Sequence, residues 1–215
     1  HSSPIRVFVR HASGGGTTLT FLPGWPDGSF GWAKVDAELA ERSDTDRLFL
    51  DYVGHGDSDK PREYPYSTYE RADLVEALWR ARSVEATIVL AFDYSCIVGL
   101  ELLARRIERQ RAGEDPGTVI RTCLLANGGL FADGHTHPWF TTPLFKSRAG
   151  GPLMWVGQHS SRAFAPFFRP VFSRSYRVTS AEIEQAYQAI SRRDGVRVLP
   201  ATAAYVDEHR EHAAR

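Results

Sequence analysis

The hydrophobic residues of the first 130 positions alternate between short continuous runs and sets with helical spacing. The apolar runs predict four strands, at residues 17–22, 47–51, 87–91 and 119–126. The helically spaced sets predict helices at residues 29–40 and 97–110, and a third that begins after Ser67-Thr-Tyr-Glu70, which has the pattern of a capping box. Strands that alternate with helices predict an α/β fold, in which a mostly parallel sheet is flanked by helices on both faces.

Beyond residue 130 this alternation stops and aromatic residues become frequent. They are Trp139, Phe140, Phe145, Trp155, Phe164, Phe167, Phe168, Phe172 and Tyr176. Thr179-Ser-Ala-Glu182 has the pattern of a second capping box and predicts a helix that ends near Asp194-Gly195, before a last helical stretch that reaches Arg215. We therefore interpret residues 1–130 as the sheet-containing core and residues 131–215 as a helical lid whose aromatics line an apolar pocket. The alternative is that these aromatics simply fill a core.

The segment Thr87-Ile-Val-Leu-Ala-Phe-Asp-Tyr-Ser-Cys-Ile-Val-Gly-Leu100 joins a predicted strand directly to a predicted helix. Such a tight turn exposes the side chain at its apex and carries the nucleophile in a large class of hydrolytic enzymes. Because the backbone folds sharply, the positions two before and two after the apex must be small. Those positions are Ala91 and Ser95 if Asp93 is the apex, but Asp93 and the β-branched Ile97 if Ser95 is the apex. Asp93 is therefore the favoured apex, and the alternative is an ordinary strand end at which Asp93 caps the helix.

Composition narrows the range of partners. The 26 basic and 26 acidic residues give a net charge of zero, so we expect no nucleic acid and no anionic membrane as partner, and a small or neutral molecule as ligand. Cys96 and Cys123 fit neither a disulfide framework nor a metal site, and we expect no metal and no cofactor. No apolar run approaches the roughly 20 residues that span a bilayer, and no signal-peptide pattern is present, so a cytoplasmic location is expected.

Two further loops follow predicted strands, at positions where hydrolytic enzymes place active-site loops. Leu22-Pro-Gly-Trp-Pro26 follows the first strand, where a loop of this kind donates one N–H group to an oxyanion hole. Asp51-Tyr-Val-Gly-His-Gly-Asp-Ser-Asp-Lys-Pro61 follows the second strand and has glycines where the chain must turn sharply. Each loop alone is a weak signal. In this order and spacing, together with the turn at Asp93, the loops strongly indicate the active site of a hydrolytic enzyme.

This arrangement resembles the branch of the α/β-hydrolase superfamily that contains haloalkane dehalogenases and epoxide hydrolases. The elbow of that branch reads His-Asp-Trp-Gly-Gly or His-Asp-Tyr-Gly and aligns with Phe92-Asp-Tyr-Ser-Cys96, and its oxyanion loop reads His-Gly-x-Pro and aligns with Pro23-Gly-Trp-Pro26. A closer resemblance is to the mesoderm-specific transcript family within that branch. It extends from Leu50 to the end of the chain and includes Ile190-Ser-Arg-Arg-Asp-Gly195 and Tyr205.

The resemblance implies a hydrolase that acts on a small apolar epoxide, haloalkane or ester. Asp93 would attack the substrate and form a covalent alkyl-enzyme ester. The backbone N–H groups of Tyr94 and Trp25 would form the oxyanion hole. Tyr176 is the candidate lid acid, because lid tyrosines assist the leaving group in epoxide hydrolases. Substrate contacts are expected from Trp25, Phe92, Trp139 and Phe168.

The site also departs from the family pattern. Phe92 and Pro23 stand where the family has histidines, and His55, His209 and His212 do not fit the place of the general base, which follows the last strand of the fold. One explanation is that a missing C-terminal segment or a second chain supplies the last strands and completes the sheet. The alternative is a non-catalytic ligand-binding or interaction protein on a degenerate fold of this kind. A cofactor-free dioxygenase, which the loop at Leu22-Pro-Gly-Trp25 also resembles, needs a serine at the elbow.

Overall fold

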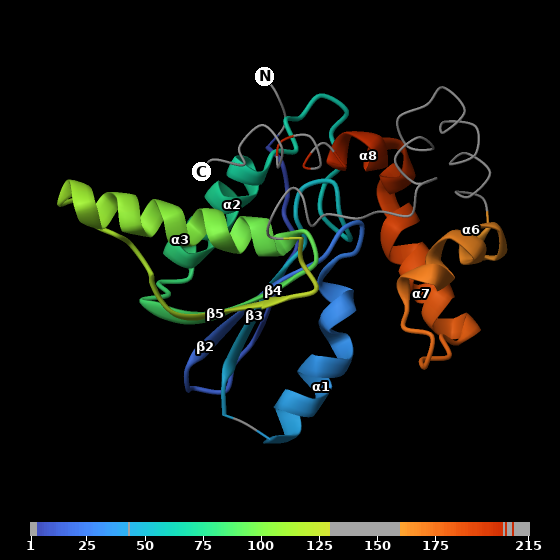
Figure 1. Ribbon diagram of the computed structural model, residues 1–215, viewed down its shortest axis with the longest axis horizontal. Helices are drawn as coiled ribbons and strands as arrows, with labels where there is room; N and C mark the ends of the chain where they lie inside the picture. Colours follow the sequence, from blue (N-terminus) through green and yellow to red (C-terminus); the bar gives the residue numbers. More distant parts are fainter. Residues whose placement is uncertain (1–3, 43, 130–159, 204, 206–207, 209–215) are drawn as a thin grey trace.

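A five-stranded sheet forms the centre of the molecule in the computed structural model, which describes residues 4–42, 44–129, 160–203, 205 and 208 (Figure 1). The strand order is β1-β3-β2-β4-β5. The strands are β1 (Val9–Ala12), β2 (Thr18–Leu22), β3 (Asp46–Leu50), β4 (Ala86–Phe92) and β5 (Val119–Ala126). The pairs among β2 to β5 are parallel, whereas β1 runs antiparallel to β3. The predicted α/β fold with a mostly parallel sheet is confirmed.

Helices cover both faces of this sheet, as the alternating pattern predicts. They are the 3-10 helix η1 (Ser29–Trp32), α1 (Ala33–Arg42), α2 (Thr68–Ala81) and α3 (Ser95–Ala112). In Figure 1, α1 lies on one face and α2 and α3 lie on the other. Leu19, Phe21 and Phe49 pack toward α1, and a larger apolar cluster that includes Val75, Leu102 and Val89 fills the other face. Burial of these apolar side chains is the main force that holds the layers together.

The hydrophobic pattern does not predict strand β1. The sequence of β1, Val-Arg-His-Ala, contains a single large apolar residue, so it carries neither a continuous run nor a clear alternation. Its pairing with β3, from Val9 opposite Leu50 to Ala12 opposite Arg47, is what fixes it as a strand. With four residues and the polar side chains of Arg10 and His11, β1 is short and polar, as edge strands often are.

The two predicted capping boxes differ in the structure. At α7 (Ser180–Ser191) both halves of the box are present, because the Thr179 side chain accepts from the Glu182 N–H and the Glu182 carboxylate accepts from the Thr179 N–H. At α2 the Ser67 hydroxyl accepts from the Glu70 N–H at 3.1 Å, but the Glu70 carboxylate accepts from the Tyr64 hydroxyl instead. Ser67 therefore caps α2 as predicted, whereas Glu70 serves a different contact.

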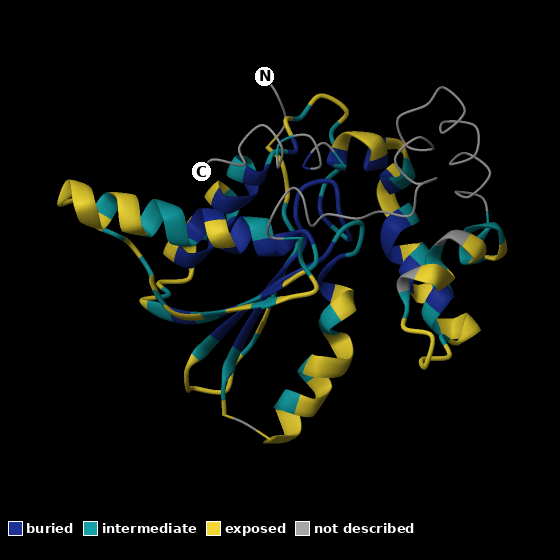
Figure 2. Ribbon diagram, viewed as in Figure 1, coloured by how far each residue is buried: buried dark blue, intermediate teal, exposed yellow. Residues whose placement is uncertain are grey.

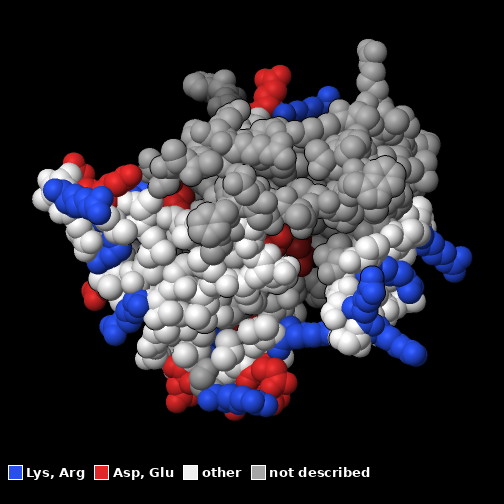
Figure 3. All heavy atoms as spheres, in the orientation of Figure 1, with Lys and Arg blue, Asp and Glu red and all other residues white. Residues whose placement is uncertain are grey.

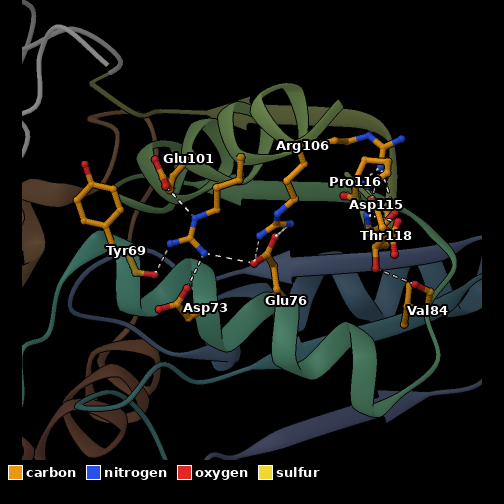
Figure 4. Close-up of polar contacts among 12 residues, drawn as sticks. Tyr69, Asp73, Glu76, Val84, Glu101, Arg106, Asp115, Pro116 and Thr118 are labelled. Carbon is orange, nitrogen blue, oxygen red and sulfur yellow. Dashed lines mark hydrogen bonds and ion pairs between the residues drawn. The ribbon is translucent and has the colours of Figure 1, made fainter. Parts of the chain in front are cut away.

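A network of ion pairs joins α2 to α3 (Figure 4). The Arg105 guanidinium donates to Glu101 at 2.8 Å, to Asp73 at 2.6 Å and to the Tyr69 carbonyl at 3.0 Å. Glu76 accepts from Arg109 at 2.6 Å. Because several charges share half-buried positions, such a network holds the two helices in register more firmly than isolated surface pairs would.

The carboxyl-terminal helices lie at one side of the sheet and contact its loops (Figure 1). They are α6 (Ser161–Phe168), η3 (Arg169–Val171), α7, η4 (Arg192–Asp194) and α8 (Gly195–Thr202). Arg192 and Arg193 pair with Asp57 and Asp59, both at 2.9 Å. The predicted division at residue 130 adjoins residues outside the described set and stays a prediction, and most of the helical stretch expected beyond α8 also lies outside that set.

Burial and charge vary across the surface. Figure 2 shows buried residues along the inner strands. In contrast, β5, one of the two outer strands of the described sheet, carries exposed residues on both faces, and its Leu124 is 53% exposed. Figure 3 shows basic side chains around the lobe formed by α6 and α7, where Arg162, Arg169, Arg174 and Arg177 are exposed. Within the described segments, no helix combines the length and hydropathy that a bilayer-spanning segment requires.

The aromatic contacts of Phe21 give a test of the packing against α1. Its ring is fully buried, stacks on Phe49 with centroids 4.4 Å apart and meets Trp32 at 5.2 Å. We expect Phe21→Ala to lower the free energy of unfolding by about 3–5 kcal/mol, measured by urea denaturation. The control Phe30→Ala, at a position 43% exposed, should change it by less than about 0.5 kcal/mol. Similar losses in the two variants would contradict this assignment of the core.

Candidate active site

The turn between β4 and α3 is strained at Asp93. Phe92 ends β4, Ser95 begins α3, and Asp93 between them has a φ of 54°. A residue other than glycine rarely adopts a positive φ, because its Cβ then crowds the backbone. Two backbone hydrogen bonds fix the turn, from the Asp93 N–H to the Ala126 carbonyl at 2.9 Å and from the Cys96 N–H to the Asp93 carbonyl at 3.0 Å. Strain of this kind at a strand-to-helix joint is the backbone geometry that a nucleophile elbow requires, and Asp93 is therefore the candidate apex.

Ser95, the other candidate for the apex, lies inside the protein. Its side chain is fully buried. Its hydroxyl donates to the Pro23 carbonyl and shares a hydrogen bond of 3.0 Å with the Tyr52 hydroxyl. These contacts tie α3 to the loop after β2. The Ser95 hydroxyl is therefore occupied by structural contacts, whereas Asp93 is half-buried at the turn itself.

The loop after β2 supplies a hydrogen-bond donor to the Asp93 carboxylate. The Trp25 N–H donates to Asp93 Oδ2 at 2.9 Å. This approach requires a glycine at position 24, because a Cβ there would lie 2.9 Å from Phe92 Cδ1 and 3.0 Å from Asp93 Cβ. Gly128 allows an equally close approach on the other side, where a Cβ would lie 2.4 Å from Cys96 Sγ and 2.8 Å from the Asp93 carbonyl oxygen. Two loops thus enclose the elbow, and each can approach it this closely only because it has a glycine at the point of contact.

Tyr205 packs beside this turn, a contact that the pattern analysis does not predict. It is buried, and its ring centroid lies 4.5 Å from that of Tyr94 and 6.3 Å from that of Trp25. Burial raises the pKa of the Tyr205 hydroxyl, and the negative charge of Asp93 raises that pKa further. The phenol therefore keeps its proton at neutral pH. In the sequence, Tyr205 stands out only as one residue of the resemblance to the mesoderm-specific transcript family. No local pattern marks it as part of a site.

The loop around Asp51 is also buried and polar. The Asp51 carboxylate accepts from the Ser29 N–H at 2.6 Å and from the Asp57 N–H at 2.8 Å. Burial raises the pKa of Asp27 to about 6, and the charge of Asp51 adds to the rise, although a hydrogen bond from the Gly28 N–H opposes it. These carboxylates hold the loops that flank the elbow, as buried acceptors of backbone N–H groups commonly do.

The structure describes two histidines, and each has a different environment. His55 is buried, its Nδ1 lies 2.8 Å from the Asp27 carbonyl oxygen, and burial holds its pKa well below the ordinary value, so the ring is neutral. His11 lies 3.9 Å from Asp46 and lines a surface hollow of about 420 Å³, with Arg82 and Arg121. That hollow is at the amino-terminal ends of the parallel strands, whereas Asp93 follows the carboxyl end of β4.

The remaining predicted site residues that the structure describes lie in two different places. Phe92 is beside Asp93 and meets Trp32 edge-on at 6.1 Å. Phe168 stacks with Phe164 and meets Phe172 edge-on, with centroids 5.1 Å apart in both pairs. Tyr176 is 43% exposed, and its hydroxyl bonds with Lys34 and Glu182. Trp139 lies outside the described residues. The structure thus brings together Asp93, Tyr94, Trp25 and Phe92, while Tyr176 and Phe168 belong to an aromatic stack of the carboxyl-terminal helices.

Comparison with known proteins agrees with this architecture. The model of the alpha/beta hydrolase family matches residues 21–213. The chain is 30% identical over 218 residues to the mesoderm-specific transcript protein of Mus musculus, covering 98% of this chain and 63% of the relative. It is also 30% identical over 212 residues to LipZ of Mycobacterium tuberculosis, covering 98% of this chain and 69% of the relative.

A solved structure gives the same picture of the fold. The epoxide hydrolase VrEH1 from Vigna radiata superposes with a TM-score of 0.68 at 15% sequence identity, over 98% of this chain and 72% of that structure. At this identity the likeness concerns the fold alone. The chain spans 63% of the length of the mesoderm-specific transcript protein. The match to the family model over most of the chain, on a mostly parallel sheet with a strained turn at Asp93, shows that this chain belongs to the α/β-hydrolase family.

Proposed function

We propose that this protein is a hydrolase of small apolar electrophiles, with epoxides as the first substrate class, and that Asp93 is its nucleophile. The observation that supports this proposal most strongly is the Asp93 carboxylate at the strained turn, with Oδ2 held 2.9 Å from the Trp25 N–H. A carboxylate at an elbow can form a covalent ester, which divides one difficult displacement into two easier steps.

In the first step an Asp93 carboxylate oxygen attacks an epoxide carbon. The carbon–oxygen bond of the ring breaks, the ester bond forms, and the ring oxygen becomes an alkoxide that must receive a proton. Tyr205 is the donor that we assign, because it is buried beside the elbow, with its ring centroid 4.5 Å from that of Tyr94 and 6.3 Å from that of Trp25. Tyr176, the lid acid expected from the sequence, has its hydroxyl engaged with Lys34 and Glu182.

In the second step water attacks the carbonyl carbon of the ester and releases the product. The oxyanion that forms would be stabilised by the backbone N–H groups of Trp25 and Tyr94, of which the Trp25 N–H already contacts the carboxylate. This step needs a general base. Since His55 is buried and neutral and His11 lies at the opposite end of the strands, we assign the base to neither of these two described histidines.

The surroundings of the elbow favour an Asp nucleophile over a serine. The Ser95 hydroxyl is fully buried and bonded to Pro23 and Tyr52, so it is not available for attack. This counts against the dioxygenase alternative, which needs an elbow serine. The apolar side chains of Phe92 and Trp32 beside the turn suit a substrate without charge. VrEH1, which shares the fold, is an epoxide hydrolase, and we therefore choose epoxides as the first class to test.

The choice of nucleophile can be tested by covalent labelling. We expect styrene oxide to form an adduct on Asp93, detected by intact-mass spectrometry and located by peptide mapping. Asp93→Asn should slow adduct formation by about 10⁴-fold or more, because the amide is not a nucleophile. Ser95→Ala, which removes only structural hydrogen bonds, should still be labelled. Labelling of Asp93→Asn at the wild-type rate would refute this assignment.

The close approach at Gly24 gives a second test. A Cβ at this position would press on Phe92 and Asp93 and move the carboxylate away from the Trp25 N–H. We expect Gly24→Ala to slow adduct formation by about 10²-fold, since small misplacements of a nucleophile are costly. Gly15→Ala is the control: it strains a positive φ in open space, so it should lower stability without changing the labelling rate. A wild-type labelling rate in Gly24→Ala would show that the loop contact does not position Asp93.

The two tyrosines can be compared directly. Tyr205→Phe removes the hydroxyl that we assign as the proton donor, and labelling by styrene oxide should slow by about 10²–10⁴-fold. Tyr176→Phe should leave the labelling rate unchanged, because its hydroxyl serves the contact with Lys34 and Glu182. The opposite ranking of the two variants would restore Tyr176 as the acid.

A further inference from the structure

Arg71 places a positive charge inside the protein, behind the elbow. It lies in the first turn of α2, and its side chain is completely buried. Its Nη1 donates to the Tyr94 hydroxyl, while its Nε and Nη2 have no hydrogen-bond partner in the described part of the chain. A guanidinium keeps its charge in proteins. Because burying a charge is costly unless it is well paired, an arginine held here by one phenol calls for a functional explanation.

The guanidinium connects to the elbow through aromatic rings. Its Cζ lies 4.5 Å from the Tyr94 ring centroid and 5.3 Å from that of Tyr52. Tyr94 in turn lies 4.5 Å from Tyr205. The order of the groups is therefore Arg71, Tyr94, Tyr205, which leads from α2 to the phenol next to Asp93. A cation over an aromatic face is attracted to the ring, most strongly where water is excluded.

The nearby carboxylates do not neutralise Arg71 by direct bonding. Glu70 accepts from the Tyr64 hydroxyl, and Glu208 accepts from the Thr68 N–H at 2.8 Å. Both lie close enough to interact with Arg71 through their charge, but the single hydrogen bond of its guanidinium among the described residues is to Tyr94. The positive charge of Arg71 acts on Tyr205, because it lowers the pKa of that phenol against the larger opposing effect of burial.

We propose that Arg71 is a positioning residue that stabilises the phenolate formed on Tyr205 when this tyrosine protonates the opening epoxide. The inference rests on the proposed function. As the ester forms, Asp93 loses its negative charge, the ring carbon–oxygen bond breaks, and the proton passes from Tyr205 to the alkoxide. One negative charge thus moves from Asp93 to Tyr205. A fixed cation on the Tyr94 side of Tyr205 favours this movement, because it is already in place when the charge develops.

This role predicts a difference between two kinds of electrophile. An epoxide needs the proton of Tyr205, whereas an alkyl bromide releases bromide ion and needs no proton. Loss of the Arg71 charge should therefore slow labelling by an epoxide and leave labelling by a bromide almost unchanged. If Arg71 only held the elbow in shape, both reactions would slow by the same factor.

The experiment measures the two labelling rates at Asp93 in the full-length protein, with styrene oxide and benzyl bromide as probes and with peptide mapping to separate cysteine adducts. Arg71→Met should lower the ratio of the epoxide rate to the bromide rate by about 10- to 100-fold. In the Tyr205→Phe background the same substitution should lower the epoxide rate no further, since the group it acts on is absent. Both rates are measured on the same preparation of each variant. Partial unfolding therefore lowers both rates equally and leaves their ratio unchanged.

Two controls separate charge from structure. Arg71→Lys keeps the charge and should retain the wild-type ratio within about threefold, even if it folds less stably. Arg105→Met removes an arginine of the α2–α3 network and should leave the ratio unchanged. Equal slowing of both probes in Arg71→Met, or additive losses with Tyr205→Phe, would overturn the role of Arg71 alone. Absence of labelling at Asp93 in the wild type would overturn the proposed function and this inference together.

Discussion

The strained turn at Asp93 is the constraint on which the arrangement of the site depends. A positive φ at a residue with a side chain is unfavourable by itself, so neighbouring structure must hold it. The hydrogen bond to Ala126 at the end of β5 holds one side of the turn. On the other side, the Ser95 hydroxyl bonds to the Pro23 carbonyl, and the Trp25 N–H meets the carboxylate. The pairing of β4 with β2 and β5 is therefore what brings the two loops within reach of Asp93.

The region behind the turn is polar where the rest of the core is apolar. Tyr52, Arg71, Tyr94 and Ser95 are all buried and are linked by hydrogen bonds or ring contacts. A set of apolar residues in the same volume would avoid the cost of desolvating a guanidinium. Buried polar networks of this kind favour one arrangement of side chains, because hydrogen bonds and ring contacts away from water depend strongly on geometry. Here that arrangement surrounds the residue that we assign as nucleophile.

Sequence reasoning succeeded where the signal is local and failed where it depends on distant contacts. The β5 strand follows the predicted range of residues 119–126, because the apolar residues on both sides of Arg121 and Thr122 mark it without knowledge of its partner strand. The turn at Asp93 could be located because its sterics restrict Ala91 and Ser95. In contrast, β1 has too few apolar residues to be recognised without its pairing to β3. Tyr205 could not be placed beside Asp93, because the two residues are far apart in the sequence and no local pattern predicts a contact between them.

A second strained turn determines where Tyr205 lies. Arg193 and Asp194 both have positive φ, of 51° and 60°, and they kink the chain between α7 and α8. A Cβ at Gly195 would lie 2.0 Å from the Ile190 carbonyl oxygen, so the tight kink requires glycine there. It directs α8 toward the oxyanion loop, where the Thr202 hydroxyl accepts from Trp25 Nε1 at 2.9 Å. Because Tyr205 follows Thr202 by less than one helical turn, this contact places the phenol at the elbow. The proposed nucleophile and the proposed acid are therefore positioned by two separate turns, which meet at Trp25.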